Sequence, residues 1–305
     1  MKKIKVFFKT LPLYFKAFFK ALGDWLKFFF KTIYANKKAF TGFIILAIFL
    51  FFTLFGRLIF PYDSATNYSE MYLGPSSKHW LGTDGLGRDL FKMMVYGTKD
   101  VMEIAFYTAI LTVGLGCVIG IISGYFGGWF DRIISLIINL FMSLPTFPIL
   151  LIMSMFLTIR DNFTLALLLA IFAWPGLARA IRSQIISLKE RDFIQICSVM
   201  GLSKGHIAFK ELLPNIFSYV AISFISSMRN GITASVGMMT LGLALYEPTN
   251  WGGIIINARN SGALSIPAAR MCIIAPIVAI MIFQIGSILF SNGLDELVNP
   301  RLRGN

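Results

Sequence analysis

Histidine, cysteine and charged residues are all scarce in this sequence. Of 305 residues only two are histidine and three are cysteine, and Asp, Glu, Lys and Arg together make up 14%. Acid–base catalysis and most metal centres depend on these side chains, so the composition argues against an enzyme. No Gly-x-x-x-x-Gly-Lys-Ser/Thr motif for nucleotide phosphates occurs either. We therefore expect no catalytic residues, no cofactor and no ATP hydrolysis by this chain.

The few cysteines do not predict a disulfide framework. Cys117 and Cys272 fall in apolar segments, and Cys197 falls in a polar one. Two cysteines within membrane segments and one in a cytoplasmic loop do not meet in an oxidising compartment, so we expect no disulfides.

One cluster of potential metal ligands occurs, because His79, Asp84 and Asp89 lie within eleven residues. A fourth ligand is missing, and glycines separate the three. The pattern favours a turn-rich structure in which Asp84 and Asp89 cap helix starts and Arg88 forms a local ion pair. We predict no metal site.

Apolar residues dominate instead. The sequence is 56% hydrophobic and 15% aromatic, with a mean hydropathy of +0.73, which is more than one soluble core of this size can bury. A helix needs about 20 apolar residues to cross a bilayer core of about 30 Å. The segments that meet this length are Phe40–Phe60, Val101–Tyr125, Ile133–Ile159, Leu165–Arg182, Ile216–Leu243 and Pro267–Phe290. We predict an all-α integral membrane protein with six transmembrane helices.

The net charge of +13 follows this topology. A nucleic-acid-binding protein would gather its basic residues on one soluble face, but here ten of the 28 precede Ala39 and six lie between Arg179 and Lys210. The positive-inside rule places residues 1–39, the loop 183–215 and the tail 293–305 in the cytoplasm. Segments 61–99 and 244–266 are then extracytoplasmic, and residues 100–292 form the core domain. We expect no nucleic-acid partner.

The N-terminal arm, residues 1–39, interleaves lysines with aromatic residues. Lysines from Lys9 to Lys38 recur at intervals of seven and four, which places them on one stripe of a helix. This pattern predicts an amphipathic helix in the headgroup plane of the membrane. The alternative is a regulatory or targeting segment.

Glycine recurs every four residues in the second apolar segment. Gly116, Gly120 and Gly124 share one helix face, and such a small-residue ridge lets a second helix approach closely. We predict that this face packs against another helix of the bundle.

The loop between the fourth and fifth apolar segments is too polar to span a membrane. Phe193, Ile196, Val199 and Met200 give one apolar face at helical spacing, and Gly201 is placed to end that helix. Ser203 is placed to cap a second helix, which Pro214 ends. We expect the loop to fold into a knob of two helices whose apolar side enters a groove on another protein.

The chain resembles the C-type permeases of ATP-binding-cassette (ABC) importers for dipeptides, oligopeptides and nickel. The motifs that carry the resemblance cover nearly everything after Gly42, and they are His79-Trp-Leu-Gly-Thr-Asp-Gly-Leu-Gly-Arg-Asp89, Tyr96-Gly97, Gly124-Tyr-Phe-Gly-Gly-Trp-Phe-Asp131, Trp174-Pro-Gly-Leu-Ala-Arg179, Trp251-Gly252 and Asn292-Gly-Leu-Asp-Glu-Leu-Val-Asn-Pro-Arg301. The resemblance implies the type I importer permease fold in a cell inner membrane. It also implies a homologous second permease, two ATPase subunits and an extracytoplasmic peptide-binding receptor as partners.

The same resemblance identifies the loop as the motif that docks the ATPase. Such loops start with Glu-Ala-Ala, whereas this one starts with Gln195-Ile196-Cys197, so the usual carboxylate is absent while the glycine and the Leu-Pro pair keep their spacing. The docking residues implied are Gln195, Ile196, Cys197, Met200, Gly201, Leu202, Leu213 and Pro214.

Arg229, Ser235 and Met238 are the candidates for lining a pathway. Arg229 is a charge inside an apolar segment, which is costly unless it faces protein, water or an opposite charge. It either lines the path or pairs with another subunit. Ser235 stands where relatives often carry Glu.

Three alternatives stand beside peptide import. The same machinery imports nickel chelates or oligosaccharides in related systems. An ion-coupled secondary transporter would need a carboxylate at mid-depth, but Glu103 lies near the edge of its segment. A membrane scaffold without transport activity is disfavoured by the docking-type loop.

Overall fold

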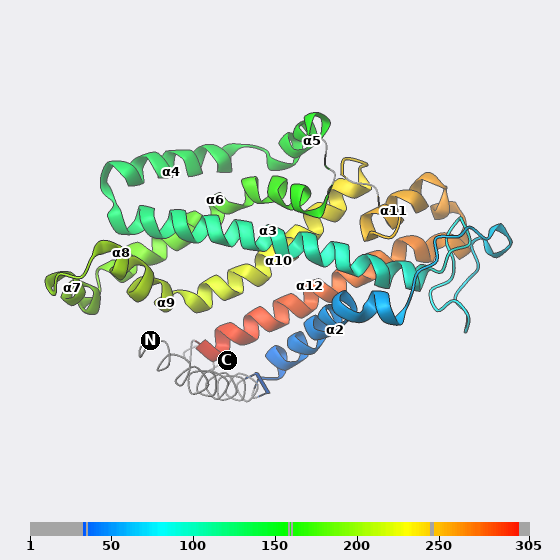
Figure 1. The fold of residues 1–305 in the computed structure, drawn as a ribbon, viewed down its shortest axis with the longest axis horizontal. Helices are drawn as coiled ribbons and strands as arrows, with labels where there is room; N and C mark the ends of the chain where they lie inside the picture. The colour runs from blue at the N-terminus through cyan, green and yellow to red at the C-terminus, as the bar shows by residue number, and fades with distance from the viewer. Residues whose placement is uncertain (1–32, 35, 158, 160, 245–246, 299–305) are drawn as a thin grey trace, which may run out of the picture.

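The computed structural model describes residues 33–34, 36–157, 159, 161–244 and 247–298, and this part of the chain is helical, with one isolated β-bridge between Thr83 and Asp89. The long helices run side by side along the long axis (Figure 1). In chain order the elements are α2 (Lys37–Ile59), η1 (Tyr68–Glu70), α3 (Leu90–Phe126), α4 (Gly128–Ser143), α5 (Thr146–Phe156), α6 (Asn162–Lys189), α7 (Asp192–Val199), α8 (Lys204–His206), η2 (Ile207–Leu212), α9 (Leu213–Asn215), α10 (Phe217–Thr240), α11 (Trp251–Asn260), η3 (Ala263–Ser265), η4 (Pro267–Arg270) and α12 (Met271–Val298).

The number of spans agrees with the prediction. Among the described residues, α2, α3, α6 and the segment Pro267–Glu296 are each long and apolar enough to cross a membrane. Two bent pairs, α4 with α5 and Lys204–Asn215 with α10, bring the total to six if each pair counts as one span. The arm predicted at residues 1–39 lies outside the described residues except at its end.

The third predicted span, Ile133–Ile159, is not one helix. It divides into α4 and α5, which meet at an angle of 86°. Pro145 has no backbone N–H, and Leu144 before it adopts the extended conformation that a following proline favours. The apolar run predicts the membrane segment, and Pro145 and Pro148 within it predict an interruption, which the structure shows as a sharp turn at Pro145.

The second predicted span starts earlier than Val101. Helix α3 begins at Leu90 and extends for 37 residues, or about 55 Å at 1.5 Å per residue. Its first turns contain the charged residues Lys92, Lys99 and Asp100. A search for uncharged apolar runs therefore does not include these turns. Residues 90–99 of the predicted extracytoplasmic segment are therefore part of α3.

The glycine ridge of α3 packs against α6, as predicted. A Cβ atom built on Gly120 would lie 2.7 Å from the carbonyl oxygen of Ala178, and one on Gly124 would lie 2.9 Å from that of Arg182. Gly116 faces Leu177 in the same way. The two backbones meet along this ridge because no side chain separates them.

Helices α2 and α12 form a second close pair. A Cβ on Gly42 would lie 2.4 Å from the backbone nitrogen of Phe290, and one on Gly293 would lie 2.4 Å from the Cβ of Ala39. At the end of the pair, Lys38 and Asn36 contact Glu296 at 2.8 and 2.7 Å. The tail was predicted to begin at residue 293, but α12 continues to Val298. The start of the predicted tail is therefore helical, and it packs against α2 as far as Glu296.

The segment 244–266 contains a helix that the sequence did not predict. Helix α11 is ten residues long, too short to span a membrane, and Trp251 at its start is 1% exposed. The Trp251 indole N–H donates to the Met94 carbonyl oxygen at 3.1 Å. Part of this predicted extracytoplasmic segment therefore belongs to the core.

Candidate functional site

Residues 190–216 form a compact knob at one end of the bundle, opposite the end that carries residues 61–89 (Figure 1). The knob contains α7, α8, η2 and α9, and it connects the end of α6 to the start of α10. The N-terminal end of α2 and the C-terminal end of α12 lie on the same side of the molecule as the knob.

A glycine ends the first helix of the knob, as predicted. Gly201 has a φ of 74°, in the left-handed region that glycine occupies without strain. Its N–H donates to the Ser198 carbonyl and the Leu202 N–H donates to the Cys197 carbonyl, at 3.1 and 3.2 Å. These are the two bonds of a Schellman motif, and they reverse the chain at the tip of the knob.

The second helix of the knob begins at a serine cap and contains a π-helical turn. The Ser203 hydroxyl accepts from the His206 N–H at 3.2 Å, which confirms the predicted cap. Helix η2 precedes Pro214, whose missing N–H cannot continue a regular helix. The chain stays helical to Asn215, one residue beyond the predicted end, and then bends by 69° into α10.

Buried apolar side chains hold the knob against the bundle. Ile194 of α7 is 2% exposed, and it packs in one cluster with Ile207, Ala208 and Leu212 of the second helix. The same cluster contains residues of α3 and α6, including Ile121 and Ile185. This cluster therefore joins α7 to both membrane helices.

Polar contacts fix the base of the knob. The Lys189 ammonium donates to the Tyr125 carbonyl oxygen at 2.8 Å, at the C-terminal end of α3, and lies over the Tyr125 ring. A cation at this position is favoured by the partial negative charge of a helix C-terminus. The side chain of Gln195 donates to the Glu190 carbonyl oxygen at 3.2 Å, so this residue caps the turn between α6 and α7.

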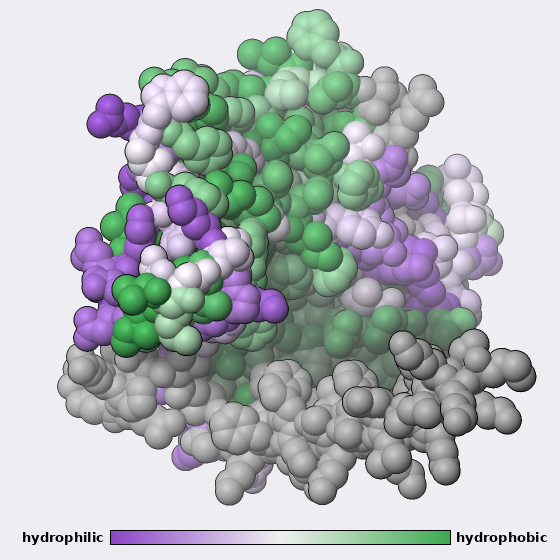
Figure 2. Space-filling model, turned by 60° about the vertical axis from the view of Figure 1, so that its left-hand side comes forward, coloured by the Kyte–Doolittle hydropathy of each residue, from purple (hydrophilic) through white to green (hydrophobic). Residues whose placement is uncertain are grey.

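The outer face of α7 is apolar and exposed. Val199 is 88% exposed, Met200 73%, Ile196 57% and Phe193 37%. In Figure 2, where this end is turned toward the viewer, apolar atoms form a patch surrounded by hydrophilic ones. Exposed apolar patches of this kind, bordered by polar residues, are typical of surfaces that bind another protein.

The residues predicted to dock an ATPase fall into two groups. Ile196 and Met200 belong to the exposed tip, and Gly201 shapes it. Gln195 is exposed on the same helix, and Pro214 is exposed at the end of the second helix. Cys197, Leu202 and Leu213 pack instead against the buried cluster that holds the knob. The sequence identified the outer face by its spacing, but it gave no sign of the inner face centred on Ile194.

The three candidates for the pathway do not lie together. Ser235 and Met238 are each 1% exposed, and the Ser235 hydroxyl donates to the Ile232 carbonyl oxygen of its own helix. Arg229 is partly exposed on a different face of α10. A cavity does open beside α10, but its lining includes Asn230 and Ala234 rather than these three.

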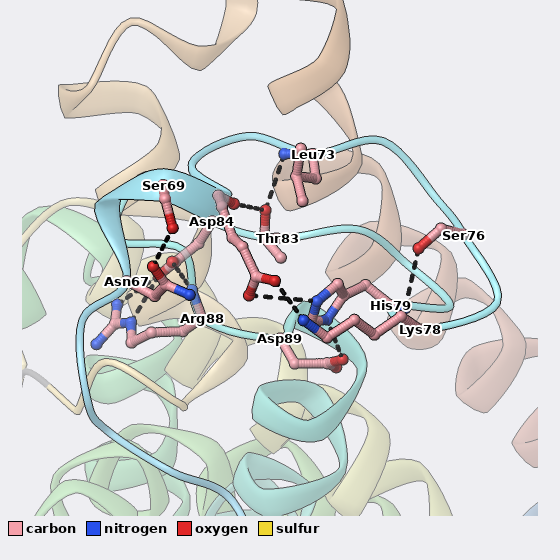
Figure 3. Close-up of polar contacts among 11 residues, drawn as sticks. Asn67, Ser69, Leu73, Ser76, Lys78, His79, Thr83, Asp84, Arg88 and Asp89 are labelled. Atoms are coloured by element: carbon pink, nitrogen blue, oxygen red, sulfur yellow. Dashed lines mark hydrogen bonds and ion pairs between the residues drawn. The ribbon is translucent and has the colours of Figure 1, made fainter.

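At the other end of the molecule, residues 61–89 are held by buried polar contacts (Figure 3). Arg88 donates two hydrogen bonds to Asp84 at 2.8 and 2.5 Å, and both residues are 8% exposed. Asp89 caps α3 by accepting from the Lys92 N–H at 2.9 Å. The predicted roles of Arg88 and Asp89 are therefore confirmed, whereas Asp84 accepts from backbone N–H groups of a turn.

His79 and its neighbours complete this polar cluster. The His79 ring nitrogen Nδ1 lies 2.8 Å from Asp89, and Nε2 lies 3.6 Å from Glu70. Lys78 pairs with Glu70, and the hydrogen bond that it donates lowers the pKa of that carboxyl. No group of three His, Cys, Asp or Glu residues able to hold a metal ion occurs in the described part of the chain.

Comparison with known proteins identifies the family. Residues 116–304 match the binding-protein-dependent transport system inner membrane component, and residues 25–75 match the N-terminal transmembrane domain of oligopeptide transport permease C. The chain is 30% identical to the dipeptide transport system permease protein DppC of Alkalihalophilus pseudofirmus, over 88% of this chain and 87% of that protein. It is 28% identical to the oligopeptide permease OppC of Bacillus subtilis over 88% and 87%, and 26% identical to the glutathione permease GsiD of Shigella dysenteriae over 88% of both.

Proposed function

Because the chain belongs to the family of binding-protein-dependent transport system inner membrane components, we propose that it is a permease subunit of an ATP-driven importer of dipeptides or oligopeptides. The names of its relatives, a dipeptide, an oligopeptide and a glutathione permease, all refer to peptides, which supports this substrate class over nickel chelates and oligosaccharides.

The exposed apolar tip of α7 carries the mechanistic part of the proposal. Val199, Met200 and Ile196 enter a groove on an ATPase subunit, where burying their side chains supplies the binding free energy. The absence of a carboxylate at Gln195 leaves this apolar contact as the main one. ATP hydrolysis takes place on the partner, and this chain has no catalytic role.

Transport follows from the way the knob is joined to the bundle. When the two ATPases close, the knob moves with its groove, and the buried cluster around Ile194 passes that movement to α3, α6 and α10. The pathway, shared with a homologous second permease, opens alternately to each side because ATP and the loaded receptor bind the two states with different affinity.

In this proposal the knob lies in the cytoplasm of a cell with an inner membrane. The N-terminal end of α2 and the C-terminal end of α12 lie on the same side as the knob, so we assign both chain termini to the cytoplasm and residues 61–89 and 247–266 to the side of the extracytoplasmic receptor. The basic residues near α6 and α7 support this orientation.

Replacing Val199 and Met200 by serine tests the docking proposal. The double variant removes apolar area without adding charge, and fully burying a Val or Met side chain contributes about 1.5–3 kcal/mol. We expect peptide uptake and receptor-stimulated ATP hydrolysis by the reconstituted complex to fall about tenfold or more, with weaker copurification of the ATPase.

Phe217→Ser is the matched control, because Phe217 is 63% exposed at the start of α10 but lies outside α7. We expect near-normal coupling in this variant. Full uptake by the Val199/Met200 variant would contradict the proposed docking site.

A further inference from the structure

An apolar groove of about 410 Å³ lies where α2, α3 and α12 meet. Among the described residues that line it, only Thr98 and Trp251 carry an oxygen or nitrogen atom in the side chain. Both are already satisfied, because the Thr98 hydroxyl and the Trp251 indole N–H donate to the Met94 carbonyl oxygen at 2.8 and 3.1 Å. The groove therefore offers no hydrogen bond to a ligand, and it suits a hydrocarbon chain.

The rim of the groove faces the membrane. Ile48 of α2 and Ile282 of α12 are 49% and 44% exposed, whereas Phe49 and Trp251 on the floor are buried. Both rim residues belong to helices that are long and apolar enough to cross a bilayer. The groove is therefore open to lipid acyl chains rather than to water.

The groove is closed at one end and open at the other. Towards the knob, α2 and α12 touch, since a Cβ built on Gly286 would lie 2.5 Å from Cγ2 of Ile45. Along α3 the groove extends from Thr98 back to Phe91, a length of about 10 Å at 1.5 Å per residue. Phe91 lies in the first turn of α3, next to residues 61–89.

A second, smaller pocket of about 190 Å³ continues the groove past Phe91, which lines both. Its other lining residues include Trp80, whose ring centroid lies 4.8 Å from that of Phe91. Trp80 is 60% exposed. Tryptophan is enriched where a membrane meets water, so this pocket, called the headgroup pocket below, lies at the level of lipid headgroups.

The headgroup pocket contains a lysine without a partner. Of its three charged residues, Lys78 pairs with Glu70, and Asp89 contacts His79 and caps α3. Lys92 is exposed, and its ammonium group forms no ion pair in the described part of the chain. A free ammonium group at this level attracts the negative charge of a lipid phosphate.

We propose that the groove and the headgroup pocket together bind one phospholipid, in the leaflet at the end that carries residues 61–89. An acyl chain fills the groove, Trp80 lies at the boundary, and the phosphate lies beside Lys92. Apolar, aromatic and basic residues follow one another along the site in the same order as the parts of a phospholipid. The proposal rests on the membrane location of the chain and is independent of the transported substrate.

The experiment uses the full-length chain, purified in detergent and freed of lipid. Phosphatidylglycerol and a diacylglycerol with the same acyl chains are the two probes, and native mass spectrometry measures the affinity of the first lipid bound. The two probes differ in the phosphate and headgroup only. Thermal unfolding without lipid shows that each variant is folded.

Two variants test the two parts of the site. Ala279→Phe fills the groove, and Ala47→Phe is its control, because Ala47 is equally intermediate in exposure on α2 but does not line the groove. Lys92→Gln removes the free ammonium group. Lys99→Gln is its control, because Lys99 lies on the same helix, outside both cavities, and pairs with Glu103 at 3.7 Å.

We expect Ala279→Phe to weaken binding of both lipids about tenfold, because the acyl chain loses its apolar contacts. Lys92→Gln should weaken binding of phosphatidylglycerol about fivefold, the usual contribution of one lysine near anionic lipid, and should leave diacylglycerol unaffected. Both control variants should bind like the unmodified chain. Because Lys92 is exposed, Lys92→Gln decides the phosphate contact whether or not Ala279→Phe folds.

Unchanged binding in a folded Ala279→Phe variant, or an equal loss in Ala47→Phe, would overturn the groove as the acyl-chain site. Equal affinity for the two lipids, or unchanged phosphatidylglycerol binding in Lys92→Gln, would overturn the phosphate contact. Loss of the bound lipid when the chain assembles with a second permease would show that the groove is a subunit interface instead.

Discussion

The knob and the outer segment 61–89 are both polar interruptions between membrane helices, but they are stabilised in opposite ways. The knob buries aliphatic side chains such as Ile194 and Leu212 against the bundle and leaves an apolar tip exposed. The outer segment buries polar groups instead, with the ion pair of Arg88 and Asp84 and the contact of His79 with Asp89.

This difference fits what each end has to do. Directional hydrogen bonds fix the outer segment in one geometry, because a buried charge tolerates little displacement from its partner. Apolar packing gives the knob a firm base without polar groups at its tip, which stays free to enter a groove. We therefore expect the stability of the outer segment to depend on its buried charges, and the stability of the knob to depend on its buried apolar volume.

The largest effect is expected from Arg88→Ala. This change leaves the buried Asp84 carboxylate without its partner, which typically costs about 3–5 kcal/mol. Unfolding of the detergent-solubilised protein measures the loss. Lys78→Ala is the control, because Lys78 is exposed and solvent screens its pair with Glu70, so its loss should change stability much less. Equal losses in the two variants would contradict the difference between buried and exposed pairs.

Ile194→Ala should come next. Truncating a buried isoleucine typically costs about 2–5 kcal/mol, and here the cavity would form beneath α7. We expect hydrogen exchange to speed up throughout the knob while residues 61–89 keep their protection. Ile196→Ala, at an exposed site on the same helix, should leave knob exchange unchanged.

Gly201→Val should have a smaller effect on stability. No atom lies within 4 Å of the added Cβ, so the cost is that of a left-handed backbone, about 1–2 kcal/mol. The strain acts at the tip, so we expect an assembled bundle that no longer stimulates ATP hydrolysis. Gly205→Val, also in open space but without a positive φ, is the control. Normal coupling in the Gly201 variant would argue against the predicted turn as part of the docking site.

The smallest effect concerns pH at the outer end. The hydrogen bond from Lys78 lowers the pKa of Glu70, so this carboxylate stabilises the folded segment above its unfolded pKa. That contribution is lost as the pH falls through the lowered folded value. Thermal unfolding of Glu70→Gln should therefore depend less on acidic pH than unfolding of the unmodified protein. Identical pH profiles would exclude the effect.

Local pattern was enough to predict the features that depend on neighbours in sequence. The apolar runs identified the membrane segments, the spacing of Gly116, Gly120 and Gly124 identified a packing face, and Gly201 identified a helix end. Each is a property of one helix or one turn, so periodicity and backbone preference decide it. The docking role of the knob and the N-terminal helix remain predictions.

Only the tertiary structure decided which side chains face a partner, the core or an open space. Ser235 and Met238 are buried although their helix also borders the cavity, and Cys197, Leu202 and Leu213 hold the knob rather than cover its tip. A helix wheel gives the angle between residues but not the direction of the neighbouring helices. For the same reason Gly120 and Gly176 look alike in the sequence, whereas the packing of α3 against α6 places one in a tight contact and the other beside a cavity.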